Sequence, residues 1–160
     1  THFLQMLHRT ENLPAVILRL FLTYGPGQDK ERFLPQVIQG CLADTTFPVS
    51  TGKQLRDFCY VDDTINAILQ ALSIPKVDGE VFNVASGTPV TIREMIKKVC
   101  SLTCTGNPLF GEITRRSVEN FVLYADITKA KNILHWEPTT NIDVGLQKTI
   151  DWFAYERTQK

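Results

Sequence analysis

Seven side chains of this sequence could bind a metal ion or act as nucleophiles: Cys41, Cys59, Cys100, Cys104, His2, His8 and His135. Zinc sites need ligands at tight spacings such as C-x2-C, and neither that pair nor an H-E-x-x-H sequence occurs here. Cys100 and Cys104 are four residues apart, which would place both on one face of a helix. We therefore expect no structural zinc, and four reduced, mostly buried thiols in a cytosolic protein, where they behave as small hydrophobic side chains.

The composition is that of an ordinary globular domain. The chain has 160 residues, of which 43% are hydrophobic and 21% charged, and this argues against wholesale disorder. Its 17 basic and 17 acidic residues cancel, so it lacks the basic excess of a general nucleic-acid binder. No apolar run approaches the length of a membrane span. The sequence starts with neither Met nor a signal-peptide pattern, so we expect a cytoplasmic fragment of a longer protein.

Hydrophobic periodicity and turn residues predict alternating helices and strands. Helices are predicted over residues 1–11, 33–42, 65–72, 91–102, 126–134 and 142–155. Strands are predicted over residues 15–22, 47–50, 57–61, 81–85, 108–111 and 121–124. Residues 62–64 are predicted to N-cap the helix that follows them, and Thr91 and Glu94 have the spacing of a capping box. Such an alternation is typical of the α/β class.

Two of the predicted strands, 15–22 and 81–85, are continuous apolar runs, which predict burial on both faces as in a parallel sheet. Arg19 interrupts the first run. Inside a buried strand its charge would need a partner, so we expect a structural role for it. Two strands cannot make the covered sheet that such burial requires. Part of the sheet is therefore expected to be missing from this chain or to come from a partner.

Four stretches resemble, in order and spacing, motifs of the extended short-chain dehydrogenase/reductases, the NAD-dependent nucleotide-sugar epimerases and dehydratases. The most specific stretch is residues 52–63, GKQLRDFCYVDD, which is similar to the family's G-x-x-x-RDF-x-YVDD segment. Residues 18–28, LRLFLTYGPGQ, are similar to its LR-x-x-N-x-YGPGQ strand and turn. Residues 81–94 resemble its FN-x-x-SG…T-x-x-E unit, and residues 125–138 resemble its AD-x-x-KA…GW-x-P ending.

The resemblance implies the C-terminal part of a Rossmann-type doubly wound sheet, interleaved with a small α/β substrate-binding lobe chiefly over residues 28–60 and 88–140. The sequence contains no G-x-x-G-x-x-G turn to hold a dinucleotide pyrophosphate, and no Tyr-x-x-x-Lys catalytic pair. We therefore expect NAD or NADP to be bound mainly by the N-terminal half of the same protein, and the chain alone to be inactive. Full-length members often form homodimers, so a homodimer is also expected.

The same resemblance assigns the diphosphate of a nucleotide sugar to Arg56 and Arg116, because a guanidinium pairs bidentately with phosphate oxygens. It assigns the ribose hydroxyls to Glu119, three residues after the second arginine. An ion pair with a nearby aspartate is the alternative for Arg56. A solvated charged loop is the alternative for the other two, and Arg115 could replace Arg116 after a one-residue slip.

Contacts to the base, the sugar and the nicotinamide are also implied by the resemblance. Phe47, Pro48 and Val49 precede Gly52 on a strand that lies alongside the base in the family, with core packing as the alternative. Leu34 belongs to a helix that commonly flanks the nucleotide.

The end of the first strand would approach the nicotinamide through Phe21, Leu22 and Tyr24. Leu22 stands where the family commonly has an Asn that contacts substrate, so that contact would move to Thr23 or be lost.

The resemblance thus implies the substrate-binding half of an NAD(P)-dependent nucleotide-sugar epimerase, dehydratase or reductase. Residues 18–28 are more similar to enzymes of lipopolysaccharide O-antigen sugar pathways, such as the abequose- and paratose-forming reductases that act on CDP-sugars. Two alternatives are a non-catalytic module that binds nucleotide sugars and regulates a full-length partner, and a structural half that completes another chain's sheet.

Overall fold

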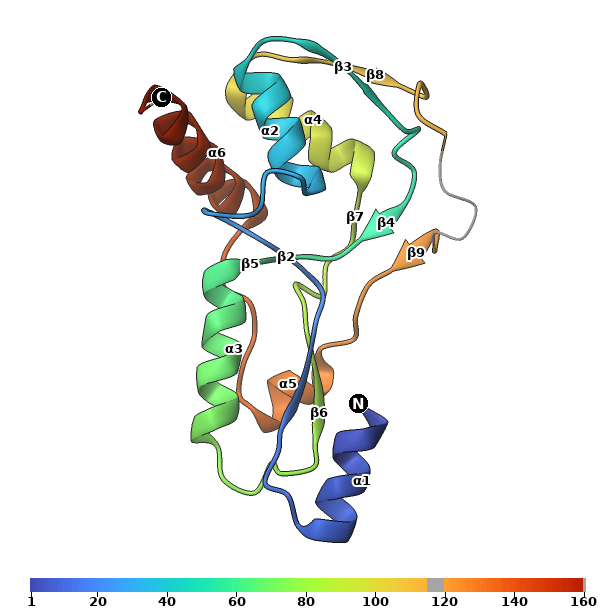
Figure 1. The fold of residues 1–160 in the computed structure, drawn as a ribbon, viewed down its shortest axis with the longest axis vertical. Coiled ribbons are helices and arrows are strands. Elements are labelled where there is room, and N and C mark those ends of the chain that lie inside the picture. The colour runs from blue at the N-terminus through green and yellow to red at the C-terminus, as the bar shows by residue number, and fades with distance from the viewer. Residues whose placement is uncertain (115–119, 160) are drawn as a thin grey trace. The chain divides into compact units, whose positions relative to one another are not determined.

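A computed structural model of the chain describes residues 1–114 and 120–159, which belong to two compact units (Figure 1). The first unit contains residues 1–23, 57–88 and 124–139. The second contains residues 24–56 and the described parts of 89–123 and 140–160. The chain therefore passes from one unit to the other after residues 23, 56, 88, 123 and 139. The expected α/β class is confirmed, and no described helix has the length and apolar character needed to cross a membrane.

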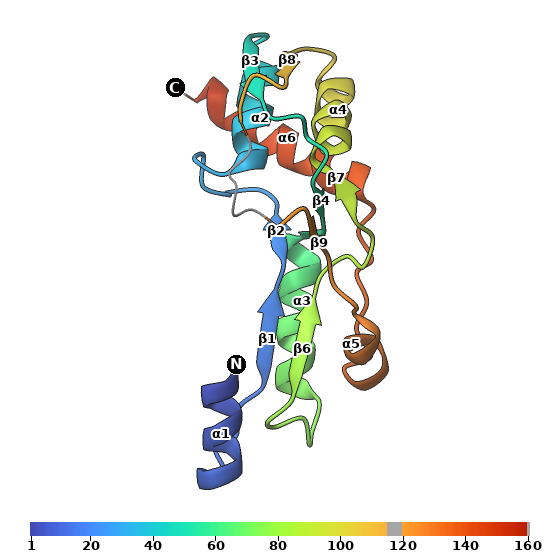
Figure 2. The same cartoon turned by 90° about the vertical axis from the view of Figure 1, so that its right-hand side faces the viewer.

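The first unit is built on two parallel strands, β1 (Ile17–Leu20) and β6 (Val81–Val84), which lie side by side in both views (Figures 1 and 2). Its helices are α1 (His2–Glu11), α3 (Val61–Ser73) and α5 (Thr128–Ile133). The strand β2 (Leu22–Tyr24) follows β1 and pairs with β5 (Phe58–Tyr60). The buried cluster of this unit includes Phe82 and Val84 of β6 together with Leu134 and Trp136.

The predicted burial of strand 15–22 on both faces is wrong. Leu18 is half-buried, whereas Arg19 and Leu20 are exposed. Among the described residues, β1 pairs only with β6, so nothing in the described chain covers its other edge. Arg19 consequently needs no buried partner, because its charge is in solvent. The predicted strand is also interrupted at Phe21, whose backbone N–H donates to the carbonyl oxygen of Val84 at 3.0 Å.

The second unit packs three helices against one another: α2 (Phe33–Leu42), α4 (Ile92–Thr103) and α6 (Ile142–Thr158). Their shared core contains Ile38, Met95, Ile96 and Leu146, all fully buried. Two strands, β3 (Thr46–Val49) and β8 (Asn107–Phe110), run parallel to each other. A small sheet places β4 (Leu55–Arg56) between β7 (Val90–Thr91) and β9 (Val122–Leu123).

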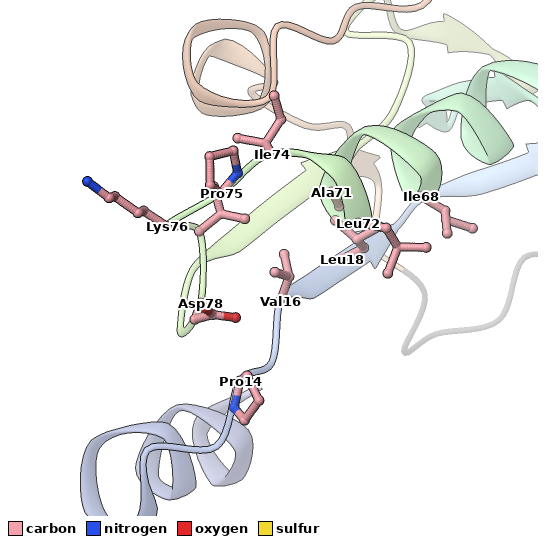
Figure 3. A pocket seen from close by; sticks show the side chains of 11 residues that line it. Pro14, Val16, Leu18, Ile68, Ala71, Leu72, Ile74, Pro75, Lys76 and Asp78 are labelled. Atoms are coloured by element: carbon pink, nitrogen blue, oxygen red, sulfur yellow. The ribbon is translucent and has the colours of Figure 1, made fainter.

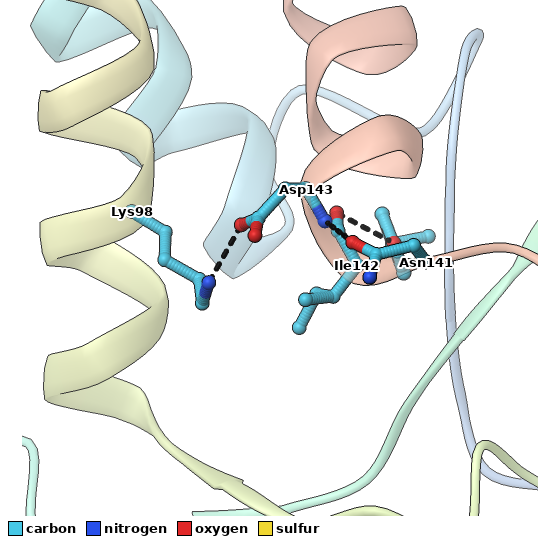
Figure 4. A network of polar contacts seen from close by, with 5 residues as sticks. Lys98, Asn141, Ile142 and Asp143 are labelled. Atoms are coloured by element: carbon cyan, nitrogen blue, oxygen red, sulfur yellow. Dashed lines mark hydrogen bonds and ion pairs between the residues drawn. The ribbon is translucent and has the colours of Figure 1, made fainter.

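Side-chain caps determine where two helices of the second unit, α4 and α6, begin. The predicted capping box of α4 is confirmed, because Glu94 N donates to Thr91 Oγ1 at 3.0 Å and Thr91 N donates to Glu94 Oε2 at 2.7 Å. At the start of α6, Asp143 N donates to Asn141 Oδ1 at 2.8 Å. The Asp143 carboxylate in turn pairs with Lys98 of α4 at 2.6 Å, which joins the two helices (Figure 4).

The prediction that residues 62–64 N-cap a helix is wrong. Helix α3 begins at Val61, and its N-cap is Tyr60, which makes no side-chain capping bond. Asp62 and Asp63 therefore lie in the first turn, where a negative charge still interacts favourably with the helix dipole. Asp63 is buried and serves a longer-range contact instead.

Candidate functional site

Arg56 lies on β4, the middle strand of the small sheet in the second unit. The pairing places it opposite Val90 of β7 and Leu123 of β9. Its guanidinium Nη1 donates to the carbonyl oxygen of Leu55 at 2.8 Å and to that of Phe121 at 3.4 Å. Only 7% of the residue is exposed. The cation is therefore held by backbone carbonyls of β4 and of the segment that enters β9.

Arg116, Glu119 and the alternative Arg115 lie outside the described residues. The description resumes at Asn120, and the next residue contacts the candidate site directly. The carbonyl oxygen of Phe121 accepts from the backbone N–H of Leu55 at 3.0 Å as well as from Arg56. The structure thus describes two elements of the predicted diphosphate site: β4, which carries Arg56, and β9, the next strand after Arg116 and Glu119 in the sequence.

The three residues predicted beside the base, Phe47, Pro48 and Val49, lie on β3, which pairs with β8 and not with β4. The Phe47 ring packs over Gly40 of α2, where an added Cβ would lie only 2.7 Å from the ring Cδ1. Val49 is buried, and its carbonyl oxygen accepts from the N–H groups of Gly111 and Ile113 at 2.9 and 3.2 Å. These contacts hold β3 within the second unit, as the core-packing alternative for this strand also expects.

Leu34 and Thr23 have different surroundings. Leu34 is 1% exposed and belongs to the buried face of α2. Thr23 is half-buried in the first unit, where its Oγ1 lies 3.3 Å from Thr64 Oγ1. The hydroxyl expected to replace the family's Asn is therefore already within hydrogen-bond distance of a neighbouring hydroxyl.

Of the residues predicted to approach nicotinamide, Phe21 precedes β2, and Leu22 and Tyr24 are its first and last residues. Phe21 and Leu22 are half-buried, while Tyr24 is buried and its hydroxyl donates to the carbonyl oxygen of Ile142 at 3.4 Å. These residues offer no cradle for a dinucleotide pyrophosphate. That cradle needs backbone N–H groups of a Gly-rich turn at a helix N-terminus, and the sequence has no such G-x-x-G-x-x-G turn. The residues of this chain do not by themselves fit NAD.

Sequence reasoning missed the roles of two fully buried aspartates, Asp57 and Asp63. Asp63 Oδ1 accepts from both the backbone N–H and the hydroxyl of Thr139 at 3.0 Å, and the Asp63 carbonyl oxygen accepts from Trp136 Nε1 at 3.0 Å. Asp57 accepts from Ser86 and other residues of its unit. Both aspartates were visible in the RDF-x-YVDD motif, but their partners follow 29 to 76 residues later. The motif alone could therefore not identify those partners.

Burial governs the acid–base character of the thiols. It is the main cause that raises the pKa of Cys59 to about 11. Burial and the neighbouring Cys100, whose Sγ lies 3.6 Å from that of Cys41, raise the pKa of Cys41 to about 12. Both groups are thus protonated at neutral pH and are poor nucleophiles. Cys104 is exposed, and within the described ranges no three His, Cys, Asp or Glu side chains come together as a metal site.

The first unit contains a pocket of about 420 Å³ between β1, α3 and the loop after α3 (Figure 3). Val16, Leu18 and Leu72 are among its apolar lining residues, and Lys76 and Asp78 also line it. Arg56 is not among the lining residues, so the pocket is distinct from the Arg56 site.

Comparison with known proteins adds the following findings. The model of the NAD dependent epimerase/dehydratase family matches residues 1–85. The dTDP-glucose 4,6-dehydratase of Xanthomonas campestris pv. campestris is 31% identical over 167 residues, which cover 98% of this chain and 47% of that protein. The chain thus spans about half the length of the curated relatives it matches.

Solved structures give the same result. The UDP-glucose 4-epimerase of Thermotoga maritima, solved with UDP-glucose, superposes with a TM-score of 0.88 at 27% identity, over 99% of this chain and 51% of that one. The UDP-glucuronic acid 4-epimerase of Bacillus cereus, solved with UDP-glucuronic acid and NAD, has a TM-score of 0.87 at 29% identity, over 97% and 50%. These likenesses confirm the expected Rossmann-type relationship.

Proposed function

The chain belongs to the NAD-dependent epimerase/dehydratase family, and we propose that its second unit binds the diphosphate of a nucleotide sugar through Arg56. The names of the relatives support this substrate class, because they include a dTDP-glucose dehydratase and epimerases solved with UDP-sugars. Within a longer protein the activity would be that of an NAD(P)-dependent epimerase, dehydratase or reductase. The 160 residues alone would be inactive, because they lack the Tyr-x-x-x-Lys pair.

The observation that carries the proposal is the pairing of β4 with β9. It sets Arg56 beside Phe121, which follows Glu119 by two positions and Arg116 by five. The strand that carries Arg56 is thus paired with the strand that follows the second segment expected to contact the substrate. Two arginines that share a pyrophosphate would neutralise its charge and fix its orientation.

We propose that phosphate binding changes one hydrogen bond of the Arg56 guanidinium. The bond to Phe121 is the weaker of the two described, since 3.4 Å lies beyond the usual donor–acceptor range of about 2.7–3.2 Å. We propose that a phosphate oxygen replaces this carbonyl as acceptor. The 2.8 Å bond to Leu55 would remain and would keep the guanidinium on β4.

The other contacts that the family resemblance implies are secondary parts of the proposal. Thr23 would contact the sugar, and Phe47 with Val49 would lie beside the base. Phe21, Leu22 and Tyr24 would line the nicotinamide side. Leu34 would act from within the core by holding α2 in place. No chemical step is assigned to these residues, because NAD would be bound mainly by polypeptide outside this chain.

A calorimetric titration of the chain with CDP-, UDP-, dTDP- and GDP-sugars tests the proposal. We expect at least one of them to bind, and Arg56→Lys to weaken that binding about tenfold or more, because lysine cannot pair bidentately. Arg93→Lys is the matched control. Arg93 also lies in the second unit, donates from Nε to the carbonyl oxygen of Thr51 at 3.0 Å, and stacks over the Phe110 ring.

The control should bind as the wild type does. Absence of binding by every sugar nucleotide, or equal losses in the two variants, would contradict the proposal. Turnover is a separate readout. With NAD(P)H and the same panel of sugars, the unaltered chain should give no product.

A second role, assembly with further polypeptide, is favoured by the open apolar face of the first unit. Leu20 of β1 and Leu69 and Leu72 of α3 are all more than half exposed. Exposed apolar surface of this kind marks an interaction surface. We propose that the N-terminal half of the same protein, absent from these residues but present in the relatives, covers this face.

A further inference from the structure

One buried carboxylate in the first unit, that of Asp57, binds two separate segments of the chain. Its Oδ1 accepts from the backbone N–H and the hydroxyl of Ser86, each at 2.6 Å. Its Oδ2 accepts from the backbone N–H of Gly87 at 3.0 Å and from that of Ala125 at 3.4 Å. We call this group, Asp57 with Ser86, Gly87 and Ala125, the Asp57 clamp. Together with the segment that contains Asp57 itself, the clamp joins three segments.

Each segment of the clamp continues directly into one strand of the small sheet that carries Arg56. Asp57 follows Arg56, the last residue of β4. Gly87 precedes the first residue of β7, Val90, by three positions. Ala125 follows the last residue of β9, Leu123, by two positions. All three strands of the β7–β4–β9 sheet are thus anchored, within three residues along the chain, to one carboxylate.

The other buried aspartate of the first unit provides a comparison. Asp63 is also nearly inaccessible, and its carboxylate also accepts from a backbone N–H and a hydroxyl, both of Thr139. The contacts described for its carboxylate come from Thr139, in a segment that leads to α6 and to no strand of the small sheet. The two aspartates are therefore similarly buried, but their carboxylates accept hydrogen bonds from different segments of the chain.

We infer that Asp57 is a positioning residue, which sets the ends of β4, β7 and β9 and thereby the place of Arg56. This inference rests on the proposed function only in naming Arg56 as the phosphate ligand. Its physical basis is that hydrogen bonds to a carboxylate are stronger than neutral ones, and that a buried N–H left without its acceptor is costly. In Asp57→Asn, one oxygen becomes an NH2 group that cannot accept from N–H donors.

Amide hydrogen exchange on the full chain tests the clamp without any ligand. In Asp57→Asn we expect the amides of β4, β7 and β9 to exchange about tenfold faster or more, because a charged hydrogen-bond network is lost. The amides of α2 should keep their protection. In Asp63→Asn the same three strands should exchange at the wild-type rate. Equal acceleration in both variants, or none in Asp57→Asn, would overturn the inference.

A milder pair of variants covers the case in which Asp57→Asn does not fold. Ser86→Ala removes one hydroxyl donor from Asp57, and Thr139→Ala removes one from Asp63. Only Ser86→Ala should accelerate exchange in the small sheet, by a smaller factor of about two to five. Equal exchange of the sheet in these two variants would also overturn the inference.

Binding is the second readout. If UDP-glucose or dTDP-glucose binds the wild-type chain, Ser86→Ala should weaken it more than Thr139→Ala does, at a temperature where both variants are folded. Equal affinities would contradict the positioning role. If no sugar nucleotide of the CDP-, UDP-, dTDP- and GDP-sugar panel binds the wild type, the proposed function fails, while the exchange experiment still decides whether the clamp positions the sheet.

Discussion

Both units of this chain have fully buried apolar side chains, and they differ in how much apolar surface their helices expose. In the second unit, Ile38, Met95, Ile96 and Leu146 are fully inaccessible between three helices. In the first unit, α3 exposes much of its apolar face, and Leu72 is 80% exposed. The second unit therefore has a closed core of its own. The first unit has a core on one side of β1 and β6. It also has an exposed apolar surface of the kind that marks an interaction site.

The two units therefore lead to different expectations for the effects of mutations. The residues of the second unit specify a self-contained lobe, which supports assigning substrate binding to it. The exposed apolar side chains of the first unit fit the proposal that further polypeptide covers them. Large effects on stability are therefore expected in the closed core, and effects on association are expected on the open face.

The largest effect is expected from truncation of the closed core. Ile96→Ala in α4 removes a fully buried side chain, which should lower the free energy of unfolding by about 2–5 kcal/mol. Urea unfolding followed by circular dichroism measures this value. A loss below about 1 kcal/mol would show that the core of the second unit is not closed.

The next effect concerns the turn that supports α1 in the first unit. Gly79 has φ +78°, and an added Cβ would lie 2.2 Å from Cδ2 of the His8 ring. Gly79→Ala should lower the free energy of unfolding by about 1–3 kcal/mol because it combines backbone strain with a clash. Combining it with His8→Ala should recover part of that loss in a double-mutant cycle. Additive effects of the two changes would contradict the contact.

A smaller effect depends on pH. The backbone N–H and the hydroxyl of Thr91 hold the pKa of Glu94 below its ordinary value of 4.5. The stabilisation is therefore complete above that value and is lost as the pH falls through the lower pKa of the folded state. Glu94→Gln keeps the acceptor but does not titrate. The variant should lose less stability than the wild type between neutral pH and acid, as measured by thermal unfolding across that range.

The smallest effect on stability is expected on the open face. Leu72→Ser should change the free energy of unfolding by no more than about 0.5 kcal/mol, because the side chain is mostly exposed. The same change should lower concentration-dependent self-association, which static light scattering measures. A large loss of stability with unchanged association would contradict the difference between the units.

The sequence predicted the elements well where local chemistry determines them. Apolar spacing gave α2 over residues 33–42, and the Thr91–Glu94 pair gave the start of α4. It failed where partners are distant in sequence. Asp62 and Asp63 were expected as an N-cap and a first-turn acid; both lie in the first turn of α3, but the Asp63 carboxylate also bonds to Thr139, 76 residues away. The run 15–22 predicted double burial, but the described chain provides one pairing strand only.

The candidate site was also predicted only in part, because the partners of its residues are distant in the sequence. The family's sequence motif pointed to Arg56. It did not point to Phe121, 65 residues away, whose carbonyl oxygen accepts a hydrogen bond from Arg56. It also suggested ligand contacts for Leu34, although apolar spacing alone would have placed that residue in the core. Residue types therefore indicated the chemistry, whereas strand pairing determined which groups are neighbours.

The most direct test of the central claim is the side-chain NMR signal of Arg56. The Nε–H resonances of the chain are recorded with and without UDP-glucose, dTDP-glucose and the other sugar nucleotides, and Arg56→Lys assigns the signal by its absence. The account predicts that the Arg56 resonance shifts on addition of a sugar nucleotide while that of Arg93 stays in place. A bound sugar nucleotide that leaves the Arg56 resonance unchanged would contradict it.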